Sequence, residues 1–168
     1  MENYSIKTVC LSLTLMITSY LLGTLILIIF NPLLGLFYLF LCIITLLCSM
    51  KLRCTHCFYY GKRCYSGLGV LSKIFFSKGD SEEFTNPKKV FPIAILSFSI
   101  LLLPILIGIF LIINNLSIQI FILLFIYILV GILQNFFLRG KLCEKCEQGK
   151  LGCPAYNKMR KQKKKKEV

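Results

Sequence analysis

The stretch TVCLSLTLMITSYLLGTLILIIFNPLLGLFYLFLCIITLLCSM, residues 8–50, contains no charged side chain. A second uncharged stretch covers residues 90–138. One membrane-spanning helix needs roughly 20 consecutive apolar residues, so each stretch is long enough for two spans. Hydrophobic residues make up 57% of the 168 residues, and the mean hydropathy of +0.76 lies far above that of soluble domains. The sequence therefore predicts an all-α integral membrane protein.

Polar residues divide each uncharged stretch near its middle. Asn31 and Pro32 divide the first, and Asn114 and Asn115 divide the second. Asparagine and proline favour turns over helix interiors. The first apolar run is longer than the core of a signal peptide, and no small-residue cleavage pattern follows it, so we expect it to be a membrane helix. We expect four transmembrane helices, near residues 8–30, 33–50, 91–113 and 117–138.

The basic residues are distributed unevenly around these helices. Of the 20 lysines and arginines, one precedes the first helix, eight lie in residues 51–89 and eleven follow residue 138. The two short turns contain none. Because basic residues near helix ends stay on the cytoplasmic side, we predict a multi-pass cell-membrane protein with both termini and the long loop in the cytoplasm.

Each predicted hairpin is followed by three cysteines with the spacing C-x2-C-x6-C. The segments are KLRCTHCFYYGKRC, residues 51–64, and CEKCEQGKLGC, residues 143–153. Adding 89 to each residue number of the first triplet gives the second, so the repeated cysteines are Cys54, Cys57, Cys64, Cys143, Cys146 and Cys153. Two consecutive hairpins have the same orientation, which a pseudo-two-fold axis along the membrane normal would relate. We therefore predict two parallel hairpin repeats, each followed by a cytoplasmic cysteine knuckle.

This repeat divides the chain into four parts. Residues 1–69 form the first repeat, 70–90 an interfacial segment and linker, 91–156 the second repeat, and 157–168 a basic, disordered tail. The tail is expected to anchor the topology and to contact anionic lipid headgroups, since it lacks the interleaved residues that sequence-specific nucleic-acid binding requires. Residues 68–78 have helical apolar spacing, which suits either a short interfacial helix or a loop packed on the cysteines.

Three chemistries are open to six cytoplasmic thiols. Structural disulfides are disfavoured because the cytosol keeps thiols reduced. Metal binding is favoured because C-x2-C is a common intracellular metal knuckle and thiolates are soft ligands for zinc, cuprous copper or iron–sulfur clusters. We therefore expect a metal–thiolate centre with the six repeat cysteines as ligands. The alternative is a membrane thiol–disulfide oxidoreductase with a reactive C-x-x-C pair.

The cysteine spacing is similar to that of the binuclear zinc cluster of fungal transcription factors, in which six cysteines hold two zinc ions. The resemblance covers the cysteines and some basic residues between them, and it implies that Cys54 and Cys143 bridge both ions. It implies that each shell is completed by two further cysteines: Cys57 and Cys64 for one ion, Cys146 and Cys153 for the other. In that family a short linker joins the halves, whereas here two membrane helices intervene.

A [4Fe–4S] cluster on four of the six cysteines is the alternative cofactor. The ferredoxin run C-x2-C-x2-C is absent, which favours zinc. His56, the single histidine, lies inside the first knuckle and could complete a three-cysteine, one-histidine site. Lys145 occupies the equivalent position of the second knuckle, so we expect His56 to be a solvated loop residue.

The segments CTHCFYYGKRCYSGLG and RGKLCEKCEQGKLGCPAY resemble motifs of an uncharacterised prokaryotic family of small, four-helix, cysteine-rich membrane proteins. The resemblance covers most of the chain and implies that fold, but no activity.

The predicted helices contain no ionisable Asp, Glu, Lys, Arg or His side chain. This excludes proton relays, ion-coupled transport and a haem with axial histidines within the membrane. No serine, histidine and aspartate set or carboxylate pair suits catalysis, so the sequence favours a role other than an enzyme. The open roles are a structural or docking module, metal handling, or electron transfer to a cytoplasmic or membrane redox protein.

Overall fold

The computed structural model describes residues 3–115, 118–138, 142–143, 146–151, 153 and 156. These residues form helices joined by loops and contain no strand. The helices are α1 (Ile6–Phe30), α2 (Pro32–Leu52), α3 (Leu68–Phe75), α4 (Pro87–Asn115), α5 (Ile118–Ile132) and α7 (Glu147–Lys150), the short 3₁₀ helices η1 (Cys54–His56) and η2 (Ser81–Thr85), and the π-helical segment η3 (Leu133–Leu138).

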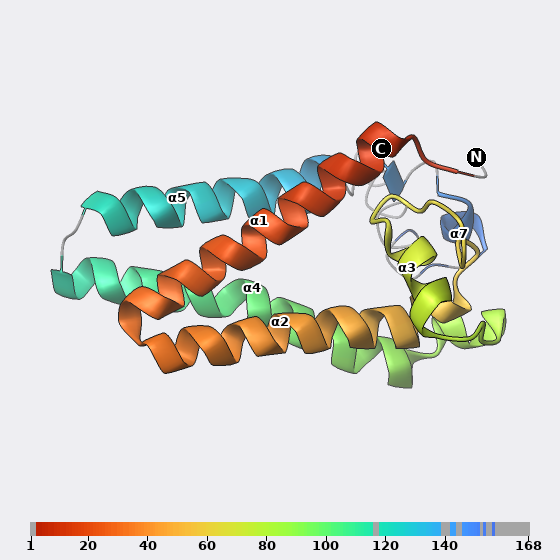
Figure 1. The fold of residues 1–168 in the computed structure, drawn as a ribbon, viewed down its shortest axis with the longest axis horizontal. Coiled ribbons are helices and arrows are strands. Elements are labelled where there is room, and N and C mark those ends of the chain that lie inside the picture. Colours follow the sequence, from red (N-terminus) through yellow and green to blue (C-terminus); the bar gives the residue numbers. More distant parts are fainter. Residues whose placement is uncertain are drawn as a thin grey trace, which may run out of the picture.

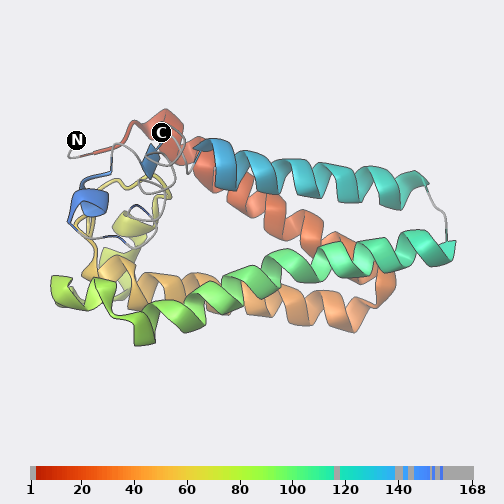
Figure 2. The ribbon, with the colours of Figure 1, turned by 180° about the vertical axis from the view of Figure 1, so that it is seen from behind.

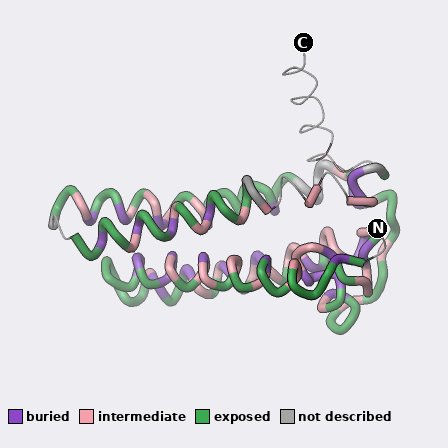
Figure 3. Tube along the Cα trace, turned by 90° about the horizontal axis from the view of Figure 1, so that it is seen from above, coloured by how far each residue is buried: buried purple, intermediate pink, exposed green. Residues whose placement is uncertain are grey.

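Four of these helical segments are long and apolar enough to cross a membrane: Ile6–Phe30, Pro32–His56, Phe91–Asn114 and Ile118–Asn135. The prediction of an all-α, four-helix membrane protein is thus confirmed in its main features. Their outward surfaces carry many exposed large apolar side chains, as a lipid environment allows. Figure 3 shows buried residues recurring along each long helix between exposed ones.

The four long helices form one elongated bundle, in which α1 contacts α2, α4 and α5. The α1–α2 turn, the end of α4 and the start of α5 lie at one end (Figure 1). The opposite end carries the start of α1, the loop after α2, and α7, as the view from behind also shows (Figure 2). The cysteine-rich segments that follow the two hairpins are therefore brought to the same end of the bundle.

The predicted turn at Asn31 and Pro32 is confirmed. The Asn31 side-chain oxygen accepts hydrogen bonds from the backbone N–H groups of Leu33, at 2.9 Å, and Leu34, at 3.4 Å. Asparagine is a favourable N-cap, and proline suits the first helical position because its missing N–H has no partner to lose there. The turn therefore ends α1 and starts α2 within a single residue.

The centre of the bundle is built around Pro104 of α4. Proline has no N–H group, so the Ile100 carbonyl, four residues earlier, has no partner within its own helix. The Tyr38 hydroxyl of α2 donates to this oxygen at 3.1 Å, and the Tyr127 hydroxyl of α5 lies 3.5 Å from it. Gly23 of α1 allows this approach, because a Cβ added there would lie 2.6 Å from the Tyr38 hydroxyl. All four long helices meet at this point.

Replacing Tyr38 with phenylalanine should therefore destabilise the bundle by about 1 kcal/mol, the usual scale of a hydrogen bond between membrane helices. In a Pro104→Ala background, Tyr38→Phe should lower the free energy of unfolding much less, because the restored N–H of residue 104 donates to the Ile100 carbonyl. A double-mutant cycle from denaturant unfolding in detergent measures this difference. Equal costs in both backgrounds would contradict the proposed role of the tyrosine.

Candidate functional site

The cysteine-rich segments of the two hairpins share one small core. Its buried residues are Tyr4, Tyr59 and Cys64, with exposed fractions of 4%, 2% and 8%. Cys57 from the first triplet and Cys146 from the second pack against them. Figures 1 and 2 both show the loop after α2 beside α7. Segments about 90 residues apart in the sequence are thus brought together at the end of the bundle.

The first triplet is organised by its own loop and by the start of α3. Cys54, in η1, is close enough to Cys57 and Cys64 for charges on the three sulfurs to repel one another. The Cys64 sulfur accepts a hydrogen bond from the backbone N–H of Gly69 at 3.2 Å. The Cys57 sulfur is in hydrogen-bonding contact with the backbone amide of Tyr59. Backbone N–H groups are thus directed at two of the three sulfurs.

The second triplet shows a similar arrangement at its middle cysteine. The Cys146 sulfur is in hydrogen-bonding contact with the backbone amides of Gly149 and Gln148, and its charge would interact with that of Cys153. Cys143 is close enough to the Tyr4 hydroxyl to interact electrostatically with it. In each triplet, the backbone amide two residues after the middle cysteine therefore contacts the sulfur of that cysteine.

The two C-x2-C segments also have the same backbone hydrogen bonds. In each, the N–H of the middle cysteine donates to the carbonyl of the first cysteine, at 3.3 Å for Cys57 and 3.2 Å for Cys146. The carbonyl of each middle cysteine then accepts from the N–H group three residues later, at 3.0 Å in both. The equal spacing in sequence is therefore accompanied by equal local hydrogen bonding.

Two further hydrogen bonds join the segments to each other. The Phe58 N–H donates to the side-chain oxygen of Gln148 at 2.6 Å. The Glu147 N–H donates to the Tyr59 hydroxyl oxygen at 3.3 Å. The two donors, Phe58 and Glu147, are 89 residues apart, and so are the two acceptors, Tyr59 and Gln148. Each segment therefore supplies one donor and one acceptor at equivalent positions. Such reciprocal pairing is the pattern of a contact between two-fold related surfaces.

The N-terminal segment completes this core and was not anticipated from the sequence. The Tyr4 N–H donates to the Arg63 carbonyl at 3.0 Å, and the Tyr4 hydroxyl donates to the Leu142 carbonyl at 3.0 Å. The Tyr4 ring also packs on that of Tyr59, with centroids 5.6 Å apart. Tyr4 has no sequence signal, and Tyr59 and Gln148 are marked in the sequence only as equivalent positions of the two triplets, 89 residues apart.

Burial dominates the electrostatics of the described thiols. It raises the pKa of Cys57 to about 11, although the Tyr59 amide acts in the opposite direction. It also raises the pKa of Cys146, against the amides of Gly149 and Gln148. All nine cysteines are free of disulfides. Without a bound metal, Cys57 and Cys146 are therefore neutral thiols at pH 7.

The six repeat cysteines do not form a completed metal shell in this arrangement. Among the residues that the structure describes, no three Cys, His, Asp or Glu side chains converge to hold a metal ion. The structure brings cysteines of both triplets into one core, and their role as metal ligands stays a prediction. Lys145 and the tail, residues 157–168, lie outside the described residues.

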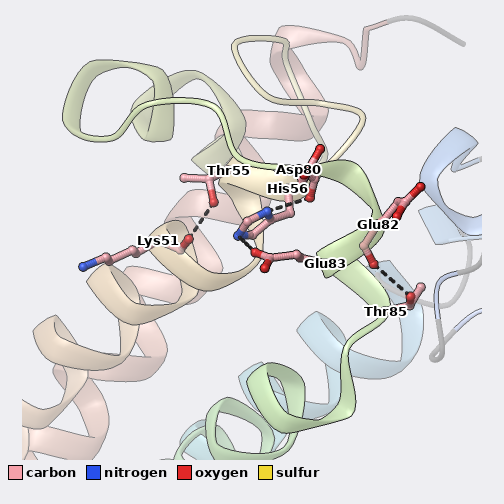
Figure 4. Close-up of polar contacts among 7 residues, drawn as sticks. All are labelled: Lys51, Thr55, His56, Asp80, Glu82, Glu83 and Thr85. Carbon is pink, nitrogen blue, oxygen red and sulfur yellow. Dashed lines mark hydrogen bonds and ion pairs between the residues drawn. The ribbon is translucent and has the colours of Figure 1, made fainter.

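The expectation that His56 is solvated is wrong. Its side chain is 9% exposed. Its Nδ1 lies 2.7 Å from the Asp80 carbonyl oxygen, and its Nε2 lies 3.4 Å from the Glu83 carboxylate (Figure 4). Gly79 lets the loop fold over the ring, because a Cβ added there would lie 2.5 Å from Nδ1. His56 therefore fastens η1 to the segment that leads into α4, with both ring nitrogens occupied.

The chain matches no protein-family model, no curated protein and no solved structure. The two cysteine-rich stretches therefore identify no family, and the chain is characterised by four long apolar helices and nine cysteines.

Proposed function

We propose that this multi-pass membrane protein holds a zinc–thiolate centre between two pseudo-symmetric cysteine knuckles at the cytoplasmic end of its helical bundle. The ligands are the six cysteines of the two triplets. The cytoplasmic assignment rests on the basic residues, which flank this end of the bundle in sequence and are absent from the two turns. Zinc has no redox chemistry, so its role here is structural: it locks the two hairpins together and shapes a docking surface.

The observation that carries the proposal is the reciprocal pair of hydrogen bonds between the two knuckles. Phe58 with Gln148 and Glu147 with Tyr59 are equivalent under the 89-residue offset. A contact of this kind presents equivalent side chains of both segments to a shared axis. Cys57 and Cys146 are themselves equivalent by this offset, and their charges are close enough to interact. This supports a centre that draws ligands from both repeats.

The backbone amides provide a second line of support. Amide N–H groups contact the sulfurs of Cys57, Cys64 and Cys146. Hydrogen bonds from N–H groups stabilise a thiolate relative to a thiol, and they fix the orientation of a sulfur that binds a metal. Metal binding displaces the thiol protons, and in small metal sites the binding energy becomes folding energy.

The pKa values argue against the thiol–disulfide oxidoreductase. A reactive C-x-x-C needs a thiol pKa below the usual value, so that a thiolate is present at neutral pH. Burial instead raises the pKa of Cys57 and of Cys146. These thiols are poor nucleophiles when they carry their protons, whereas a divalent cation would favour their deprotonation.

The test is to purify the protein anaerobically and to measure metals and acid-labile sulfide per chain. We expect a colourless protein with about two zinc ions per chain, as six thiolates can hold when two of them bridge. A Cys10→Ser variant is the matched control and should retain the metal, because Cys10 lies on the exposed surface of α1.

Brown protein that contains iron and acid-labile sulfide would show that the centre is an iron–sulfur cluster, and the protein would then be an electron carrier. Metal-free protein with six reactive thiols would contradict the metal centre itself. The cytoplasmic location fails if a membrane-impermeant maleimide labels the six cysteines in intact cells.

A further inference from the structure

Helix α3 has one face buried against the cysteine loop. Gly69 and Ser72 lie on this face, and both are buried. The Gly69 N–H donates to the Cys64 sulfur at 3.2 Å, and the Gly69 carbonyl accepts from the Gly61 N–H at 2.8 Å. At the end of the helix, the Tyr60 hydroxyl donates to the Phe76 carbonyl at 2.8 Å. The loop that carries the first cysteine triplet and α3 are therefore one packed unit.

The outer side of α3 is apolar and exposed. Val70, Ile74 and Phe75 have exposed fractions of 40%, 70% and 63%. Lys73 lies between them in the sequence and Lys78 follows the helix, and both are exposed. A short helix with large apolar residues on one side and lysines beside them is typical of segments that lie in the membrane interface.

The position of α3 matches this composition. Gly67, which precedes the helix, packs on α1, where an added Cβ would lie 3.0 Å from Val9 and 2.9 Å from Leu13. These residues belong to the first turns of the candidate membrane span Ile6–Phe30. Helix α3 also contacts α2 and lies across the end of the bundle (Figure 1). It therefore lies at the level where the chain leaves the apolar part of the membrane.

We propose that α3 rests in the cytoplasmic headgroup region of the bilayer, with Ile74 and Phe75 among the upper acyl chains and Lys73 and Lys78 at anionic headgroups. The bilayer is the occupant because it already surrounds α1 at this level, and the lysines complement anionic lipid. The two alternatives from the sequence are thereby combined, since one face of α3 packs on the cysteine loop and the other on lipid. Helix α3 then lies between Cys64 and the bilayer surface.

The chain contains no tryptophan, so a single introduced tryptophan reports on one position without background. A Phe75→Trp variant should be placed in nanodiscs of phosphatidylcholine and phosphatidylglycerol that carry bromine near the top of the acyl chains. We expect blue-shifted emission and quenching by the brominated lipid. The matched control is Leu151→Trp, because Leu151 is similarly exposed, at 66%, and directly follows α7, which lies at the same end of the bundle.

Quenching of Phe75→Trp at least about twofold stronger than that of Leu151→Trp would support the proposal, as expected for a residue inserted at the interface. Replacing Lys73 and Lys78 with glutamine should weaken this quenching in anionic nanodiscs but not in pure phosphatidylcholine. Emission at the wavelength of solvated tryptophan, without extra quenching, would overturn the proposal. So would blue-shifted emission that bromine leaves unchanged and that depends on protein concentration, since this would place a second copy on the helix. None of these outcomes depends on bound metal.

Discussion

A Cys57→Ser, Cys146→Ser double variant should lose its bound zinc and a large part of its thermal stability. One cysteine is removed from each knuckle at the place where their charges interact, so neither half can complete a shared centre. Structural zinc contributes its binding energy to folding, and we expect the thermal transition to fall by about 10 °C or more. The transition is measured as the temperature at which the detergent-solubilised protein loses its monodisperse elution profile.

A Cys10→Ser, Cys48→Ser variant is the matched control, because it also exchanges two sulfurs for oxygens but at helix positions away from the cysteine core. It should keep its metal and its transition temperature. A zinc chelator should lower the transition of the unmodified protein toward that of the double variant and should leave the double variant unchanged. If the chelator left the transition temperature of the unmodified protein unchanged, and the double variant were equally stable, the cysteines would contribute only packing.

Replacing Gly69 with valine should separate α3 from the cysteine loop. A Cβ at this position would overlap the Tyr59 carbonyl oxygen and lie 2.7 Å from the Lys62 carbonyl oxygen. Both obstacles are backbone atoms, which cannot rotate away as a side chain can. We expect a cost of about 3 kcal/mol, at the upper end of the range for overpacking. The hydrogen bond from Gly69 to Cys64 would be lost with it.

The measurement is the rate at which Cys64 is alkylated, followed by mass spectrometry in metal-free, reduced protein. Cys64 is 8% exposed in the intact core, so opening of the loop should raise the rate by roughly tenfold or more. Gly131→Ala is the control, since its added Cβ would lie 3.6 Å from the Leu101 side chain, an ordinary contact. An unchanged Cys64 rate in Gly69→Val would contradict the close packing of α3 on this loop.

Much of the fold was predictable because it follows from local properties of the chain. The absence of charge from residues 8–50 and 90–138 leaves membrane helices as the stable arrangement of those segments. Asn31 and Pro32 have the capping and backbone properties that a turn needs, and the structure places the turn there. The equal spacing of the two cysteine triplets was also visible, and it led to the expectation that they share one face of the membrane.

Contacts between distant residues were less predictable. His56 was expected in solvent because Lys145 stands at the equivalent position of the second triplet, yet Asp80 and Glu83 cover it from 24 or more positions away. The π-helical segment Leu133–Leu138 has no signature in hydropathy, which treats all helical forms alike. Tyr4 precedes every helix and cysteine, and its place in the cysteine core depends on how the first helix sits against the loop.

The sequence alone determined how many times the chain can cross a membrane, where the first hairpin turns, and that the two cysteine triplets have the same spacing. Each of these depends on the composition of one segment or on a fixed interval between residues. Only the tertiary structure decided that the Gln148 side chain accepts a hydrogen bond from the Phe58 N–H, that the Tyr59 hydroxyl accepts one from the Glu147 N–H, and that an amide of α3 reaches Cys64. Such bonds require atoms to meet within about 3 Å, and that distance is set by the packing of whole helices rather than by any one stretch of sequence.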